Sequence, residues 1–246
     1  MKPRDEAHRP QFHFTPRRHW INDPNGLVFF DGEYHLFFQY NPFGDQWGHM
    51  SWGHAVSTDL LHWQELPLAI PEDERVSIFS GSVVVDATNS SGFGDGRHPP
   101  LVAIYTGCLR RPEGGQAQEL ACSTDRGRSW TKYAGNPVLD LGLRDFRDPK
   151  VFWHAPTARW VMVVVVPDER CAKFYASHDL KAWQWLSDFA APFDGDGIWE
   201  CPDLIELPDP ARGPGGTSWL LKVDVFGGHP SGGTGARLFV GGFDGR

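Results

Sequence analysis

One short pattern occurs three times along this chain and constrains its fold more than any other feature. Each copy is a Ser-x-Asp turn closed by a tryptophan, and the copies span residues 57–63, 123–130 and 177–183. Short runs typical of strands flank every copy, so the pattern predicts strand, tight turn, strand. The aspartate can accept hydrogen bonds from its own turn, and we expect the tryptophan to cover the hairpin.

The segments between these turns predict further strands. Helical periodicity is nearly absent, and about four strands fall in each repeat. Repeats of ~40–50 residues with four short strands are typical of a β-propeller. A β-sandwich is the competing interpretation, but sandwiches do not repeat in this way. The additional runs rich in β-branched and aromatic residues are 26–30, 34–40, 50–56, 80–86, 101–107, 149–153 and 160–166.

The fourth repeat is shorter than the others. It begins near Glu200 and reaches the position of its turn at residues 242–245, where the sequence ends. The last strand of this blade is therefore expected to be missing. Because a propeller normally closes on itself, we expect about four blades of a longer protein, and hence a fragment or truncated form.

The composition of this 246-residue chain limits the classes of molecule that it is expected to bind. A net charge of −8 disfavours nucleic acid and anionic membranes. The 11 tryptophans suit either sugar stacking or a tightly packed all-β core. The four cysteines form no CxxC pair, which disfavours zinc, and we expect free thiols. No signal peptide is visible and no apolar run could span a bilayer, so we expect a cytoplasmic protein, with secretion left open.

Three carboxylates occur at the same phase of the repeat, in the first, third and fourth repeats. The first strand of a propeller blade lines the central channel, so the residues just before it should surround the channel mouth. In the first repeat, we expect residues 24–26 to turn the chain into this strand. The residues at the equivalent positions are Asp23, Phe79 with Ser80, Arg147 with Asp148, and Glu200. We expect all of them to converge on one funnel.

Converging carboxylates have a defined chemistry. They repel one another, so the pKa of at least one should rise. A carboxyl group with a raised pKa can act as a general acid, and an ionised one nearby can act as a nucleophile or charge stabiliser. Two such groups about 5–5.5 Å apart are the apparatus of a retaining glycosidase. A metal site is the alternative, but no contiguous calcium-binding loop is present, so we expect neither metal nor cofactor.

The motifs around these positions resemble the catalytic module of glycoside hydrolase family 32, the invertases, levanases and exo-inulinases. They include W-I-N-D-P-N-G (20–26), W-G-H-M-S-W-G-H-A-V-S-T-D-L-L-H-W (47–63), F-R-D-P-K (146–150) and W-E-C-P-D-L (199–204). Several dispersed motifs in the right order make a specific signal. The resemblance implies a five-bladed propeller followed by a β-sandwich, with the fifth blade and the sandwich absent from this chain.

The resemblance also implies roles for individual residues. Asp23 would be the nucleophile, Glu200 the acid/base, and Asp148 a stabiliser of the transition state that also holds fructose hydroxyls. A cysteine at the position of Cys201 is thought to tune the acid in this family, and a small buried residue is the equal alternative. The positions that match residues around the terminal fructose are Asn22, Gln39, Trp47, Phe79, Ser80 and Arg147.

The implied activity is retaining hydrolysis through a covalent fructosyl-enzyme intermediate. The carbohydrate substrate would be a fructan (levan or inulin) or sucrose, each losing terminal β-D-fructofuranosyl units. The glycine-rich run 227–235 is similar to loops of levanase-like and exo-inulinase-like members. A non-catalytic propeller that binds fructan or sucrose is the alternative, and a five-bladed furanosidase acting on arabinan or xylan is a weaker one. The preferred substrate, sucrose 6-phosphate included, and the oligomeric state stay open.

Overall fold

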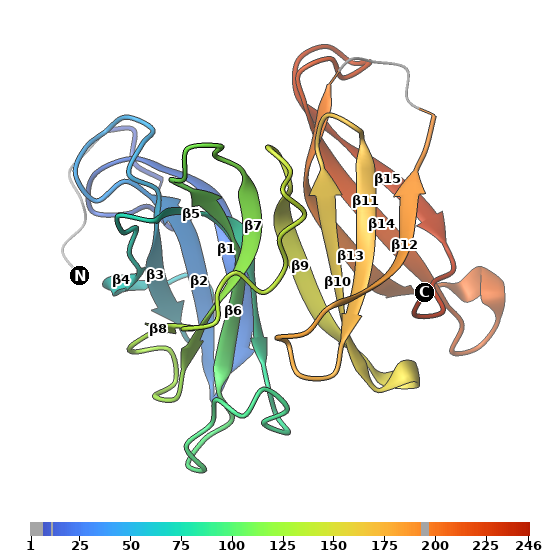
Figure 1. The fold of residues 1–246 in the computed structure, drawn as a ribbon, viewed down its shortest axis with the longest axis horizontal. Coiled ribbons are helices and arrows are strands. Elements are labelled where there is room, and N and C mark those ends of the chain that lie inside the picture. Colours follow the sequence, from blue (N-terminus) through green and yellow to red (C-terminus); the bar gives the residue numbers. More distant parts are fainter. Residues whose placement is uncertain (1–6, 11, 193–196) are drawn as a thin grey trace.

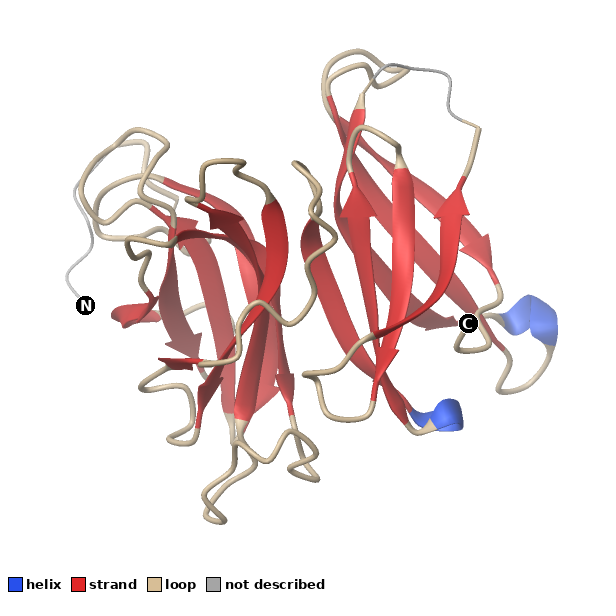
Figure 2. Ribbon diagram, viewed as in Figure 1, coloured by secondary structure: helices blue, strands red, loops and turns tan. Residues whose placement is uncertain are grey.

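The described residues form four antiparallel sheets, and each sheet contacts the one that follows it in the sequence (Figure 1). The computed structural model describes residues 7–10, 12–192 and 197–246. Figure 2 shows that strands dominate, with two short 3₁₀-helices, η1 (Ala155–Thr157) and η2 (Pro210–Arg212), at loops. In the described ranges, no helix is long and apolar enough to cross a membrane.

Each sheet is a meander of consecutive strands, as expected for propeller blades. Blade 1 consists of β1 (Ile21–Phe30), β2 (Glu33–Tyr40), β3 (Ser51–Ser57) and β4 (Gln64–Ile70). Blade 2 consists of β5 (Val76–Val85), β6 (Leu101–Leu109), β7 (Gln116–Ser123) and β8 (Thr131–Lys132). Blade 3 consists of β9 (Arg147–His154), β10 (Arg159–Val166), β11 (Cys171–Ser177) and β12 (Gln184–Ala190). Blade 4 has only β13 (Ile198–Pro208), β14 (Thr217–Phe226) and β15 (Gly235–Gly241).

The architecture confirms the predicted all-β propeller with four blades, the last of which has three strands. The first strands of the blades are neighbours: β1 contacts β5, β5 contacts β9, and β9 contacts β13. In blade 4, β15 is the edge strand, and its apolar side chains Leu238 and Val240 are 61% and 74% exposed. The repeat that was read from the sequence therefore corresponds to the blades.

The hydrophobic core is divided among three clusters, each between two neighbouring blades. Strand β10 shows why. Val161 and Val163 pack into the cluster shared with blade 4, whereas Met162 and Val164 pack into the cluster shared with blade 2. A strand buried on both faces needs a continuous apolar run rather than an alternating one, which explains the run of valines.

The three Ser-x-Asp turns form as predicted. In each of them the Oδ1 atom of the aspartate accepts backbone N–H bonds of 2.7–2.9 Å from within the turn. The indole Nε1 of the tryptophan donates to a carbonyl of the same turn at 2.9–3.1 Å. The paired residues are Asp59 with Trp63, Asp125 with Trp130, and Asp179 with Trp183. Asp244 makes one contact of the same kind, because its Oδ1 accepts the Arg246 N–H at 3.1 Å.

Candidate active site

Every innermost strand has an irregular register where a candidate site residue lies. The pairing of β1 shifts after Ile21, that of β5 after Ile78, and that of β13 after Glu200. In β9 the shift falls between Arg147 and Lys150. Such bulges insert an extra residue and redirect a side chain, which here aims polar groups into the channel.

This geometry corrects the predicted strand boundaries. The residues expected just before the innermost strands lie within them instead: Asp23 in β1, Phe79 and Ser80 in β5, Arg147 and Asp148 in β9, and Glu200 in β13. Residues 24–26 are also part of β1, so the expected turn is a doubly bulged strand. Turn-forming dipeptides gave the misleading signal, because a bulge needs the same unusual backbone conformations as a turn; Gly26, for example, has φ 55°.

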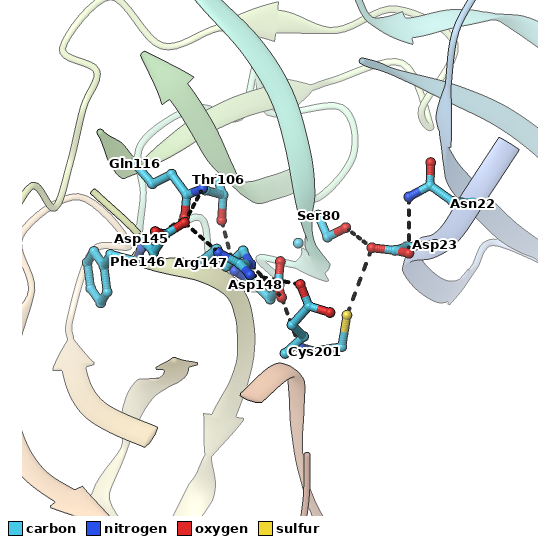
Figure 3. Close-up of polar contacts among 12 residues, drawn as sticks. Asn22, Asp23, Ser80, Thr106, Gln116, Asp145, Phe146, Arg147, Asp148 and Cys201 are labelled. Carbon is cyan, nitrogen blue, oxygen red and sulfur yellow. Dashed lines mark hydrogen bonds and ion pairs between the residues drawn. The ribbon is translucent and has the colours of Figure 1, made fainter. Parts of the chain in front are cut away.

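Figure 3 shows that both carboxylate oxygens of Asp23 accept hydrogen bonds. Its Oδ2 accepts a 2.6 Å hydrogen bond from the Ser80 hydroxyl, and its Oδ1 accepts a 3.1 Å bond from the Asn22 amide. The thiol of Cys201 lies 3.9 Å from the same Oδ2. Asn25, which the sequence analysis did not single out, bridges blades by accepting the Gly81 N–H at 3.2 Å. These contacts fix the orientation of the carboxylate at the channel mouth.

Asp148 is the most enclosed of the three carboxylates, with 7% of its surface exposed. Its N–H donates to the Thr106 hydroxyl at 2.9 Å, and its Oδ2 accepts the Cys201 N–H at 2.9 Å. Its pKa is raised to about 6, mainly by burial and also by the charges of Asp23 and Glu200, while the Cys201 N–H and Arg147 act to lower it. The expected raised pKa thus belongs to Asp148, to which the resemblance assigns the role of stabiliser.

Arg147 links the carboxylates of two blades. Its Nη2 donates to Glu200 Oε1 at 2.8 Å, its Nη1 donates to Asp145 Oδ1 at 2.9 Å, and its Nε lies 3.9 Å from Asp148 Oδ2. Burial acts to lower the pKa of Arg147, but the attraction of Asp148, Glu200 and Asp145 outweighs it, and the pKa is raised. The guanidinium therefore stays charged and holds Glu200 beside Asp148. Sequence reasoning missed Asp145, which lies two residues before Arg147.

Three predicted residues remain. Trp47 and Phe79 form a pair at the rim of the site, and Gln39 is buried. Trp47 is 60% exposed and meets the Phe79 ring edge-on, with the ring centroids 6.1 Å apart. Gln39 on β2 is 2% exposed, and within the described ranges its Nε2 has no hydrogen-bond partner. Neither Trp47 nor Gln39 lines the cavity that contains Asp23 and Asp148.

That cavity has a volume of about 390 Å³. Its lining residues include Asp23, Ser80 and Asp148, together with Cys201 and Lys222. A space of this size can hold a sugar unit, because ligand pockets typically measure roughly 300–1,000 Å³. The structure therefore brings two of the three predicted carboxylates to one cavity and joins the third, Glu200, to them through Arg147.

Comparison with known proteins agrees with the family resemblance of the sequence motifs. The family model described as Glycosyl hydrolases family 32 N-terminal domain matches residues 13–246. Levanase from Bacillus subtilis is 53% identical over 243 residues, which cover 98% of this chain and 35% of that protein.

Solved structures agree with the sequence matches. The exo-inulinase from Aspergillus awamori aligns with a TM-score of 0.90 at 42% identity, over 98% of this chain and 51% of that one. The β-fructofuranosidase from Schwanniomyces occidentalis, complexed with fructosyl-erythritol, aligns with a TM-score of 0.89 at 43% identity, over 96% and 46%. This chain thus spans between about a third and a half of the length of these relatives.

Proposed function

This chain belongs to glycoside hydrolase family 32, and on that premise we propose that it is the catalytic propeller of a retaining β-fructofuranosidase. The substrates would be fructans such as levan and inulin, together with sucrose, from which it releases terminal β-D-fructofuranosyl units. One observation carries the proposal: Asp23, Asp148 and Glu200, from three different blades, are linked through Cys201 and Arg147.

The chemistry assigned to each carboxylate follows from its surroundings. Asp23 attacks the anomeric carbon, and its fixed orientation favours a single line of approach. Glu200, which is more exposed, donates a proton to the leaving oxygen and later accepts one from the attacking water. These two steps form and then break the fructosyl-aspartate bond.

Asp148 would act without forming a bond to the sugar. With a pKa of about 6, it is ionised at neutral pH. A negative charge enclosed by protein stabilises the positive charge that develops on the fructosyl ring in the oxocarbenium-like transition state. Its second carboxylate oxygen would accept a hydrogen bond from a fructose hydroxyl.

The other predicted residues would hold the terminal fructose. Ser80 and Asn22 already contact Asp23, so they lie where the sugar hydroxyls must approach. The Trp47 and Phe79 rings offer an apolar edge at the rim, and the Nε2 donor of Gln39 has no partner among the residues that the structure describes. The levanase and exo-inulinase relatives support a fructan as the substrate class.

Fructose release by the Asp23→Asn variant tests the proposal. The unchanged chain should release fructose from sucrose, levan or inulin, and the variant should be slower by roughly 10³-fold or more, because the amide is a poor nucleophile. Substrate binding, measured by tryptophan fluorescence, should persist. Asp31→Asn is a matched control, because Asp31 is in the same blade but pairs with the surface residue Arg126.

Two results would contradict the assignment. If Asp23→Asn kept the unchanged rate, Asp23 would not be the nucleophile. If the folded unchanged chain bound a fructan or sucrose without releasing fructose, the non-catalytic binding propeller would be the better description.

A further inference from the structure

An ion pair of a lysine and an aspartate on β14 lies beside the candidate site. The Nζ atom of Lys222 is 2.5 Å from Asp224 Oδ2, and both residues line the cavity that contains Asp23 and Asp148. Across the sheet, Asp224 pairs with Glu200 on β13. Because side chains two residues apart share a face and directly paired residues face the same way, this ion pair and Glu200 lie on one side of blade 4.

Cys201 connects that ion pair to the carboxylates. Lys222 Nζ donates to the Cys201 carbonyl oxygen at 3.3 Å, while the Cys201 N–H donates to Asp148 Oδ2 at 2.9 Å. The Cys201 thiol lies 3.9 Å from Asp23. Cys201 is therefore held at its carbonyl by blade 4 and at its N–H by blade 3.

The backbone at Cys201 needs such support. Its φ of 46° lies in the left-handed region, which side chains other than glycine seldom adopt without compensating contacts. The residue occupies the bulge of β13, where the register shifts between Glu200 and Asp203. The conformation of this bulge sets the direction in which the preceding side chain, Glu200, leaves the strand.

We infer that Lys222 is a positioning residue, which acts through the Cys201 carbonyl to keep the β13 bulge, and with it Glu200 and the Cys201 N–H, in place. Asp224 holds the ammonium group of Lys222 at the required position. The inference rests on the proposed function for its catalytic consequence. It assigns Lys222 no contact with the substrate.

The neighbouring pair, Lys150 and Asp203, does not provide this support. Lys150 Nζ lies 3.2 Å from Asp203 and links β9 to β13, but it makes no hydrogen bond to Cys201 among those found in the described residues. Lys222 is thus the side chain that reaches the bulge carbonyl.

Amide hydrogen exchange tests the positioning without relying on catalysis. In Lys222→Met, which keeps the length of the side chain without its charge, the peptide covering residues 199–204 should exchange at least about tenfold faster, because its protection depends on the bulge. Lys222→Arg should restore most of the protection. Lys173→Met is a matched control, because Lys173 forms a 2.7 Å ion pair with Asp188 in the outer strands of blade 3.

Kinetics then test the catalytic consequence. Lys222→Met should lower kcat about tenfold or more while KM changes less than about twofold. The acidic limb of its kcat/KM profile should move to higher pH, because Asp148 loses a hydrogen bond that favours its ionised form. Lys222→Arg should recover both quantities.

The outcomes separate the two hypotheses. Unchanged exchange of residues 199–204 in Lys222→Met overturns the inference, whatever the activity. A raised KM with unchanged kcat overturns it as well, and identifies Lys222 as a substrate contact. If the unchanged chain releases no fructose, the proposed function fails, while the exchange experiment still decides whether Lys222 holds the bulge.

Discussion

Two residues of the candidate site have left-handed backbone conformations, Asp148 with φ 66° and Cys201 with φ 46°. Each such conformation costs about 1–2 kcal/mol for a residue other than glycine. Both are stabilised by bonds to neighbouring blades: Asp148 donates its N–H to Thr106, and Cys201 donates its N–H to Asp148. Backbone strain concentrated where carboxylates converge is typical of functional sites.

The raised pKa of Asp148 predicts a gain in stability when its charge is removed. The pKa is 3.8 in the unfolded chain and about 6 in the folded one, so stability falls as pH rises between these values. Above this window the folded state contains a charge that burial disfavours. Asp148→Asn should therefore raise the free energy of unfolding at pH 7, by up to about 3 kcal/mol.

Urea denaturation at pH 7 and near pH 3.5 measures this effect. At the lower pH the carboxyl group is protonated in the folded state and mostly protonated in the unfolded one, so most of the stabilisation should disappear. A variant less stable than the unchanged chain at pH 7 would mean that the hydrogen bonds of the carboxylate outweigh its burial.

At the scale of the element, the hairpin turns explain why the blades repeat. In each Ser-x-Asp turn the residue directly after the aspartate has a positive φ: Leu60, Arg126 and Leu180 have φ of 66°, 62° and 63°. The aspartate satisfies the N–H groups that this sharp turn leaves without partners in the sheet. The tryptophan then covers the turn and donates to its carbonyl, which fixes where the last strand of the blade begins.

Substitution of Asp179 tests whether the aspartate stabilises its turn by accepting these hydrogen bonds. Its Oδ1 accepts the N–H groups of Lys181 and Ala182 at 2.9 and 2.8 Å and the Ser177 hydroxyl at 3.0 Å. Asp179→Ala should lower the free energy of unfolding by about 1–2 kcal/mol, as for the loss of a helix-capping side chain. Asp179→Asn keeps the acceptor and should lose less than half of that, as measured by urea denaturation. Equal losses in both variants would show that charge, and not the acceptor, stabilises the turn.

At the scale of the whole molecule, the blades depend on one another. The three core clusters all lie between blades, so among the residues that the structure describes no blade has a separate core. Blades 1 and 2 also meet at a buried histidine pair, in which His35 Nδ1 and His54 Nε2 are 3.0 Å apart. Gly127, in the Ser-x-Asp turn of blade 2, packs against both imidazole rings, because a side chain there would lie within 3.1 Å of His35.

This histidine pair predicts acid sensitivity of the contact between blades 1 and 2. Burial, together with the charges of His35 and Arg128, lowers the pKa of His54 to about 3; burial also lowers the pKa of His35, despite the opposing effect of Glu33. Since the unfolded value is 6.5, the stabilisation is complete above pH 6.5 and is lost as pH falls toward 3. At pH 5 the loss from His54 should be about 2 kcal/mol.

The measurement compares the unchanged chain with His54→Gln at pH 7 and pH 5. The difference between the two proteins is the quantity of interest, because it cancels the opposite pH dependence of Asp148. The unchanged chain should lose about 2 kcal/mol more unfolding free energy than the variant between these values. Parallel losses in both proteins would show that the pair does not stay neutral when buried.

The sequence by itself determined the architecture and the identity of the candidate residues. The repeat of turn, strand and tryptophan is local chemistry, and the phase of Asp23, Asp148 and Glu200 within it is visible without coordinates. It could not place those residues inside the strands, because a bulge is defined by the partner strand as much as by its own residues.

Only the tertiary structure decided the pKa values of the site residues and the contacts between them. The raised pKa of Asp148, the role of Arg147 as a bridge, and the contact of Lys222 with the Cys201 carbonyl all depend on groups brought together from different strands. Lys222 has no sequence signal, since it is 22 residues from Glu200 and part of an ordinary strand. Burial and electrostatic attraction act through space, so their consequences appear only once the chain has folded.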